Sequence, residues 1–220
     1  MEKSIVLLSG GMDSAVVAAI ASQEHETYFL HINYGQRTEK KESEVFLSLV
    51  NYFKPRKYLI ITMEHFKSIG GSALTDTKID VPYGLSEQGV PPTYVPFRNA
   101  NFLSASVSWA EVIGAKKIFI GATEEDSAGY PDCKKGFYET FNDLIKKGTK
   151  SKDIQIVTPI IHLKKYEIVK LGIKLNVPFH LTWSCYKRED RACGRCDSCL
   201  RRLRAFKEAG ISDTIPYTNE

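Results

Sequence analysis

The chain has 220 residues, of which 43% are hydrophobic and 25% charged. This length and composition are typical of one globular domain with a sizeable core, so no disulfide framework is needed for stability. No run of about 18 apolar residues occurs, and residues 1–3 lead directly into a short apolar stretch, which argues against a membrane span and a secretory signal. We therefore expect a cytoplasmic protein that does not contact the membrane.

Both the excess positive charge and the cysteines are concentrated in one segment. Lys and Arg outnumber Asp and Glu by 30 to 26, and residues 185–204 alone hold seven basic and three acidic side chains. Subtracting this segment leaves 23 residues of each sign. Four of the five cysteines lie in the same segment. A broad basic face for nucleic acid is therefore not expected, although basic metal-binding modules do bind phosphates.

Short apolar runs alternate with segments of helical period along the chain. The predicted strands are residues 5–8, 28–32, 58–62, 118–121 and 154–158, and the helical stripes fall in 45–53, 102–113 and 168–175. This alternation predicts an α/β fold, a Rossmann-like parallel five-stranded sheet with helices on both faces. We expect a domain over residues 1–180 and a C-terminal metal-binding segment with a helix over 181–220.

The segments that leave strands one, two, four and five are rich in Gly, polar and charged residues. Ligands of parallel sheets bind beyond the carboxyl ends of the strands, so these segments are expected to line one crevice. Residues 64–100 contain many Gly and Pro and little periodicity. Loops of that length in compact domains are usually functional or disordered.

The first strand runs through Leu8 into the sequence SGGMDS, followed by the helix-forming AVVAAIAS. Two glycines let the backbone approach an anion, and the free N–H groups of the following helix point at it. The alternative is an ordinary strand-to-helix turn with Asp13 or Ser14 as the N-cap. The loop lacks both the Walker and the dinucleotide glycine patterns.

Four cysteines are spaced as two overlapping C-x-x-C steps with one further cysteine upstream. They are Cys185, Cys193, Cys196 and Cys199. Four thiolates suit a tetrahedral zinc ion, and a closed site of this kind has no open position for catalysis, so one structural Zn²⁺ per chain is expected. An iron–sulfur cluster and a redox dithiol are the alternatives. The surrounding arginines are read as counter-charge for the thiolates.

The S-G-G-x-D-S motif resembles the pyrophosphate loop of the N-type ATP pyrophosphatases. This resemblance implies that ATP is split between its α and β phosphates. The implied ATP-binding residues are Leu8, Ser9, Gly10, Gly11, Met12, Asp13, Ser14 and Asn99.

Further segments narrow the resemblance. VPFRNANFLS at 95–104, GATEEDSAGYPDC at 121–133, HINYGQR at 31–37 and TPIIHLKKYE at 158–167 are similar to motifs of the 7-cyano-7-deazaguanine synthases. That family converts 7-carboxy-7-deazaguanine, ammonia and ATP into a nitrile in queuosine biosynthesis. The resemblance implies free ammonia, Mg²⁺ with ATP, and a homodimer. A tRNA-modifying adenylating enzyme, of the thiolation or lysidine type, and a non-enzymatic nucleotide sensor are the alternatives.

The resemblance also implies roles for single residues. Arg98 and Lys165 are expected to neutralise charge at the α-phosphate. The alternative for Arg98 is a salt bridge within its loop, and the alternative for Lys165 is a solvent-exposed position at the start of a helix. Phe97 stands where a glycine often precedes the arginine, which affects the loop backbone. Lys134 stands where an arginine often follows the cysteine, which keeps the charge and loses a bidentate fork.

Carboxylates on the loop after the fourth strand are expected to bind the purine-like base. Asp132 is the first choice for its N1–H and 2-amino donors, with Tyr130 for stacking. Glu124 and Asp126 are expected to bind the base or hold Mg²⁺, and any of the three acids alternatively caps the next helix. Cys133, the odd cysteine, is placed among the catalytic residues as part of the substrate pocket, with packing and thiol chemistry as alternatives.

Overall fold

Five parallel strands form the centre of the computed structural model, in the order β3-β2-β1-β4-β5. The structure describes residues 1–85, 89–125 and 129–218. The strands are β1 (Glu2–Leu7), β2 (His25–Asn33), β3 (Lys57–Thr62), β4 (Lys117–Ile120) and β5 (Gln155–Val157). All five predicted strands are confirmed, each within a few residues of its expected bounds. The Rossmann-like fold class is confirmed with them.

The register places β1 at the middle of the sheet, where Ile5 pairs with Tyr28 on one side and Ile118 on the other. Alternate residues of β1 are buried in two different cores, Val6 in one and Ile5 in the other. Both faces of the sheet are therefore covered, which is why the strands read as continuous apolar runs rather than alternating ones.

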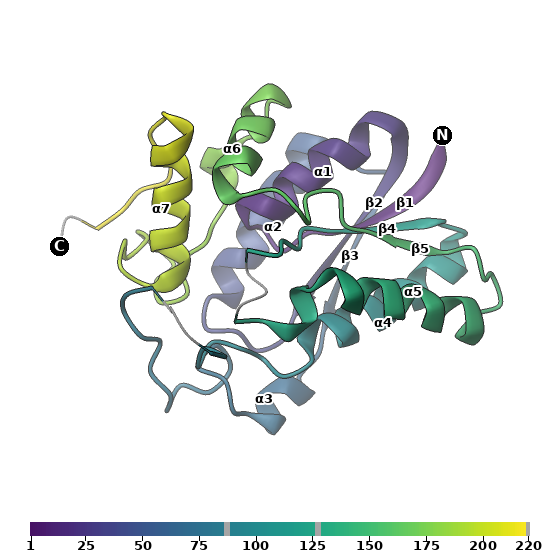
Figure 1. Cartoon of the computed structure of the whole chain (residues 1–220), viewed down its shortest axis with the longest axis horizontal. Coiled ribbons are helices and arrows are strands. Elements are labelled where there is room, and N and C mark those ends of the chain that lie inside the picture. Colours follow the sequence, from purple (N-terminus) through teal and green to yellow (C-terminus); the bar gives the residue numbers. More distant parts are fainter. Residues whose placement is uncertain (86–88, 126–128, 219–220) are drawn as a thin grey trace.

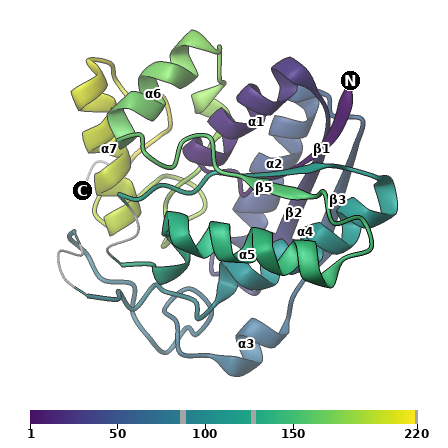
Figure 2. The same ribbon diagram turned by 45° about the vertical axis from the view of Figure 1, so that its right-hand side comes forward.

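Helices cover both faces of the sheet (Figures 1 and 2). The helices are α1 (Met12–Glu24), α2 (Glu39–Phe53), α3 (His65–Ile69), α4 (Arg98–Ile113), α5 (Lys135–Gly148), α6 (Lys165–Lys174) and α7 (Asp197–Ala209). In both views α1, α2 and α6 lie on one side and α4 and α5 on the other, while α7 packs beside α6. Short 3₁₀ turns occur at Pro131–Cys133 and Phe179–Leu181. The predicted helical stripes are confirmed in α2, α4 and α6.

The long segment between α3 and α4 is held in place by specific bonds. The Arg37 side chain donates from Nε to the carbonyl of Ala73 at 2.6 Å and from Nη2 to that of Ile79 at 2.6 Å. Further along, Tyr83 forms an isolated antiparallel bridge with Cys196. These bonds connect the long segment to the loop between β2 and α2 at one point and to the cysteine segment at another.

Candidate functional site

A cavity of about 280 Å³ lies at the carboxyl ends of the strands. It is lined by the turn after β1, the segment after β2, the first turn of α4, the segment after β4 and the start of α6. This confirms the predicted shared crevice. Residues 183–186 and the first two turns of α7 also line the cavity, so the C-terminal segment supplies one of its walls.

The glycine loop forms one end of the cavity. Gly10 has φ +92°, and a Cβ at this position would lie 2.8 Å from Val45 Cγ1, so only glycine fits. The Ser9 and Ser14 hydroxyls lie 3.1 Å apart, and the Gly11 N–H donates to Ser9 Oγ at 3.3 Å. Except for Gly10, every residue of the predicted ATP loop from 8 to 14 lines the cavity.

The loop differs from the ordinary side-chain-capped turn considered from the sequence. The N-cap of α1 is Gly11, without a side-chain cap, so neither Asp13 nor Ser14 has the N-cap role considered from the sequence. The first-turn N–H groups of α1 thus have no side-chain cap at the cavity. Gly121 approaches from the end of β4, where a Cβ would lie 2.8 Å from the Ser14 nitrogen.

Lys165 is buried at the start of α6 and points to the same loop. Its ammonium donates to Asp13 Oδ2 at 2.7 Å, and the two side chains are 9% and 22% exposed. Its backbone N–H donates to Glu125 Oε2 at 2.8 Å. A solvated helix start is therefore excluded, and a cation is positioned beside the anion loop.

Arg98 begins α4 and lines the same cavity. Its Nη1 donates to the Tyr34 hydroxyl at 3.1 Å, and its guanidinium carbon lies 5.3 Å from the Tyr34 ring centre and 5.8 Å from that of Phe102. Its buried Nε has no hydrogen-bond partner. No described carboxylate forms an ion pair with it, so the loop salt bridge is excluded. Burial raises the pKa of Tyr34 to about 12, so this phenol stays neutral.

Asp132 lies behind the cavity wall. It is buried, and its Oδ2 accepts the backbone N–H of Asn99 at 3.0 Å, so it caps the first turn of α4. The Asn99 amide donates to the Asp132 carbonyl at 3.2 Å and to Cys133 Sγ at 3.7 Å. Asn99 and Cys133 line the cavity, whereas Asp132 does not. Asp132 therefore caps a helix, which was the alternative considered from the sequence, but the capped helix is α4 rather than the following helix α5.

The other residues predicted to bind the base differ in whether they line the cavity. Tyr130 lines the cavity, with its hydroxyl 2.8 Å from Thr93 Oγ1. Glu124 does not line the cavity; its carboxylate pairs with His162 at 3.1 Å, and its side chain is 47% exposed. Asp126 lies outside the described residues.

Several cavity residues were missed from the sequence. Tyr34, Glu42, Trp183, Tyr186 and Asp197 all line the cavity. The N-Y-G-Q-R segment after the second strand was the available signal for Tyr34. No local pattern marks Glu42, which lies on α2 within an ordinary charged run.

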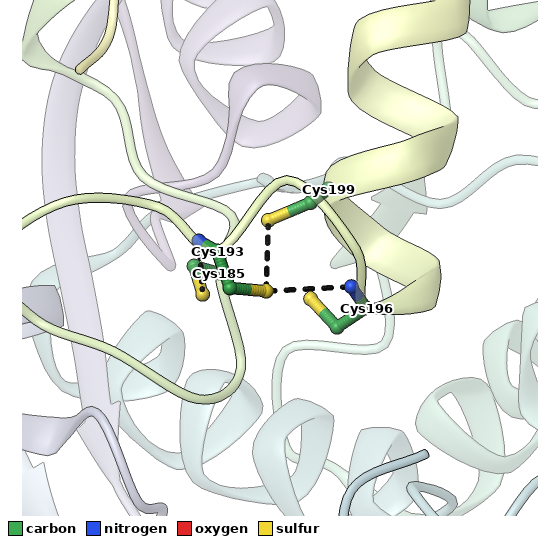
Figure 3. Close-up of side chains that lie close together, drawn as sticks. All are labelled: Cys185, Cys193, Cys196 and Cys199. Carbon is green, nitrogen blue, oxygen red and sulfur yellow. Dashed lines mark hydrogen bonds between the residues drawn. The ribbon is translucent and has the colours of Figure 1, made fainter. Parts of the chain in front are cut away.

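The four cysteine sulfurs converge at the base of α7 (Figure 3). They lie within 4.8 Å of one another, and Cys193 Sγ is 3.9 Å from Cys199 Sγ. Zinc–sulfur bonds of about 2.3 Å in a tetrahedron separate the sulfurs by about 3.8 Å, so the donor set fits one tetrahedral ion. Backbone N–H groups donate to the sulfurs, including Cys196 N to Cys193 Sγ at 3.3 Å. None of the five cysteines forms a disulfide.

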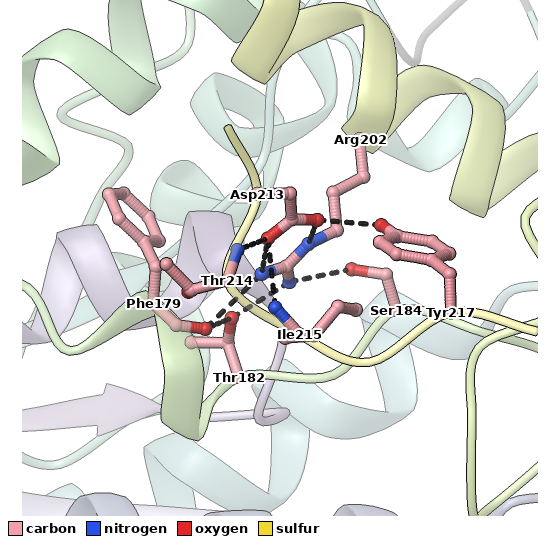
Figure 4. A network of polar contacts seen from close by, with 8 residues as sticks. All are labelled: Phe179, Thr182, Ser184, Arg202, Asp213, Thr214, Ile215 and Tyr217. Atoms are coloured by element: carbon pink, nitrogen blue, oxygen red, sulfur yellow. Dashed lines mark hydrogen bonds and ion pairs between the residues drawn. The ribbon is translucent and has the colours of Figure 1, made fainter. Parts of the chain in front are cut away.

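A buried polar network holds the metal segment against the rest of the protein (Figure 4). Arg202 is 1% exposed and donates to Asp213 from Nε at 2.6 Å and from Nη2 at 2.9 Å. Its Nη1 donates to Thr182 Oγ1 at 2.8 Å, and the Tyr217 hydroxyl donates to Asp213 at 2.6 Å. Arg188, Arg201 and Arg204 of this segment also form ion pairs with acids, while the interpretation of its arginines as counter-charge for the thiolates stays a prediction.

Comparisons with known proteins agree with this arrangement. Residues 3–210 match the family model described as queuosine biosynthesis protein QueC. The chain is 53% identical over 223 residues to a 7-cyano-7-deazaguanine synthase of Acidobacterium capsulatum, covering 99% of this chain and 97% of the relative. It is 56% identical over 218 residues to one of Chloroherpeton thalassium, covering 98% and 96%.

The fold also recurs in a solved structure. A predicted subunit of tRNA methyltransferase from Methanocaldococcus jannaschii superposes with a TM-score of 0.54 at 15% identity, over 99% of this chain and 93% of that one. This likeness concerns the fold alone. In the described part of the chain no helix has both the length and the hydrophobicity to cross a membrane. With a family model spanning nearly all of its length, the chain belongs to the QueC family of queuosine biosynthesis proteins.

Proposed function

We propose that this enzyme converts 7-carboxy-7-deazaguanine and ammonia to 7-cyano-7-deazaguanine at the expense of ATP. The observation that carries the proposal is one cavity lined by the glycine loop, by Lys165 and by Arg98 among aromatic rings. The names of the relatives support the same reaction.

The chemistry follows from the poor leaving group of a carboxylate. A carboxylate oxygen attacks the α-phosphate, the bond to pyrophosphate breaks, and an acyl adenylate forms. Ammonia attacks the acyl carbon, AMP leaves and a proton is lost, which gives the amide. The amide oxygen attacks the α-phosphate of a second ATP and pyrophosphate leaves, and loss of AMP and of both N–H protons then gives the nitrile. Each product therefore consumes two ATP and releases two AMP and two pyrophosphates.

The residues fit these steps. Ser9, Ser14 and the first-turn N–H groups of α1 would bind the leaving pyrophosphate. Lys165 would stabilise the charge that develops at the α-phosphate, with Asp13 fixing its ammonium. The unpartnered Nε of Arg98 would receive the substrate carboxylate or the phosphate. Asn99, Tyr130 and Cys133 would contact the nucleotide or the base from the α4 side.

Two metals belong to the proposal. Mg²⁺ would enter with ATP and shield its phosphate charge. Glu124 and Asp126 remain its predicted ligands, while base binding by Glu124 is disfavoured by its position outside the cavity. Zn²⁺ in the four-cysteine site would be structural and would hold the start of α7 against the cavity. A cytoplasmic homodimer with free ammonia as nitrogen donor completes the proposal.

The test is a defined reaction. The protein is incubated with ATP, Mg²⁺, ammonium and 7-carboxy-7-deazaguanine, and the nitrile and nucleotide products are measured by mass spectrometry and chromatography. We expect the nitrile, with AMP rather than ADP as the product of ATP. Stoichiometric ADP, or AMP release only in the presence of tRNA, would contradict the proposal, and the latter would favour the tRNA-modifying alternative.

A further inference from the structure

Three carboxylates line the cavity in the part of the chain that the structure describes: Asp13, Glu42 and Asp197. Two of them are paired with cations. Asp13 lies 2.7 Å from the Lys165 ammonium, and Asp197 lies 2.8 Å from Arg201 Nε. Glu42 has no cation within the 4.0 Å that defines an ion pair among the described residues. It is the one of these three carboxylates without an ion pair, although the Arg98 guanidinium lies near enough to lower its pKa.

Neutral donors hold the Glu42 carboxylate in one orientation. Thr38 Oγ1 donates to Oε1 at 2.7 Å, and Gln36 Nε2 donates to Oε2 at 3.0 Å. Gln36 is itself fixed, because its Oε1 accepts the Tyr34 backbone N–H at 2.8 Å. Each carboxylate oxygen accepts about two hydrogen bonds, so each keeps accepting capacity.

Burial makes this arrangement costly in the unliganded protein. Burial raises the pKa of Glu42, although the bonds from Thr38 and Gln36 oppose the shift. A partly buried carboxylate whose direct hydrogen-bond partners are neutral is less stable than one in water, and the nearby Arg98 guanidinium offsets part of this cost. A ligand with two adjacent N–H donors would offset that cost, whereas a ligand with an acceptor in that place would add to it.

Glu42 lies near the glycine loop and near the aromatic part of the cavity wall. Its backbone carbonyl lies 3.5 Å from the place of a Cβ on Gly10, so it borders the phosphate loop. Tyr34 lies near it in the cavity wall, and the Arg98 guanidinium lies against Tyr34 and Phe102. Flat rings and a cation suit a planar base that carries a carboxylate.

We propose that Glu42 binds the N1–H and 2-amino donors of the 7-deazaguanine ring and so selects a guanine-type base. This assignment rests on the proposed function. A guanine edge presents two neighbouring donors to the two carboxylate oxygens, whereas adenine presents a donor beside the acceptor N1. The carboxylate therefore favours the substrate over the adenine of ATP and takes the role first expected of Asp132.

The test compares Glu42→Gln with Glu44→Gln, an exposed acid on the same helix outside the cavity. Affinities are measured by calorimetry for 7-carboxy-7-deazaguanine, for its analogue without the 2-amino group, and for ATP. Hydrogen bonds to a charged group are worth about 1.5–3 kcal/mol, so Glu42→Gln should weaken substrate binding about 10- to 150-fold. Binding of ATP should change less than about twofold, and Glu44→Gln should match the wild type.

Discrimination against the analogue separates recognition from a structural role. The wild type should prefer the 2-amino compound, and Glu42→Gln should lose most of that preference while its thermal unfolding midpoint is unchanged or higher. Retained preference, or a loss of ATP affinity equal to that of the substrate, would overturn the assignment, the latter in favour of ribose binding. A wild type that fails to bind 7-carboxy-7-deazaguanine at all would instead contradict the proposed function.

Discussion

The buried pair of Arg202 and Asp213 gives the sharpest prediction for stability. Both side chains are 1% exposed, and the two bonds between them are 2.6 and 2.9 Å long. Replacing Arg202 with Met keeps much of the volume and leaves the Asp213 carboxylate buried without its cation. Breaking a buried pair by removal of one partner costs about 3–5 kcal/mol. At about 2–4 °C per kcal/mol for a protein of this size, the unfolding midpoint should fall by about 6–20 °C.

The assay uses an internal reporter. Trp183 is 5% exposed and donates from Nε1 to the Arg188 carbonyl at 3.2 Å, so its fluorescence reports on the C-terminal segment. Thermal unfolding of the metal-loaded protein is followed in a Trp109→Phe background. The control is Arg204→Met, which removes an exposed arginine from the same helix and should leave the midpoint unchanged.

A double-mutant cycle isolates the pair itself. Asp213→Asn alone should destabilise to a similar extent as Arg202→Met, because it leaves the guanidinium uncompensated. The double variant should lose less than the sum of the two by about 2 kcal/mol or more. Additive effects, or a loss below about 1 kcal/mol for Arg202→Met, would refute the reasoning that this pair holds the segment in place.

Three further predictions follow from the same geometry. Burial would raise the pKa of Asp213, but its hydrogen bonds and ion pair with Arg202 lower that pKa overall. The stability that this group contributes is therefore present above the unfolded-state pKa of about 3.9 and is lost as the pH falls through the lower folded-state pKa. Asp213→Asn should flatten that part of a plot of unfolding free energy against pH. Lys165→Gln should reduce kcat about 100- to 1,000-fold, measured as AMP release, and an unchanged kcat would remove Lys165 from the α-phosphate. Chelation of the bound metal should change Trp183 fluorescence and abolish nitrile formation, with recovery on adding Zn²⁺; full activity without metal would contradict a structural role.

The fold was readable from the sequence because its signals are local. Each strand is a short apolar run between polar segments, and the crevice at the carboxyl ends follows from parallel topology alone. The glycine loop and the four cysteines could also be identified from the sequence, because the residues of each motif lie close together in the chain. The proximity of Lys165 to Asp13, 152 residues apart, came only from the family resemblance.

The sequence did not allow a prediction of which side chains line the interior of the cavity. Asp132 and Glu42 look alike in sequence, as acids within polar segments, yet one caps α4 behind the wall and the other lines the cavity. The difference depends on how α2 and α4 pack against the sheet, which no local pattern records. The contribution of α7 to the cavity is equally non-local, because it requires the metal segment to fold back onto the strand ends.

The contact of Asp213 with Arg202 also bears on the order in which the protein is completed during synthesis. The glycine loop is made first, near residue 10, and Lys165, which contacts it, much later. Asp213, which pairs with Arg202, and Tyr217, which donates to Asp213, follow every described residue that lines the cavity. A nascent chain that has just completed α7 therefore carries Arg202 without its buried counter-ion. The polar network of Figure 4 is complete only when the last of these residues has been made.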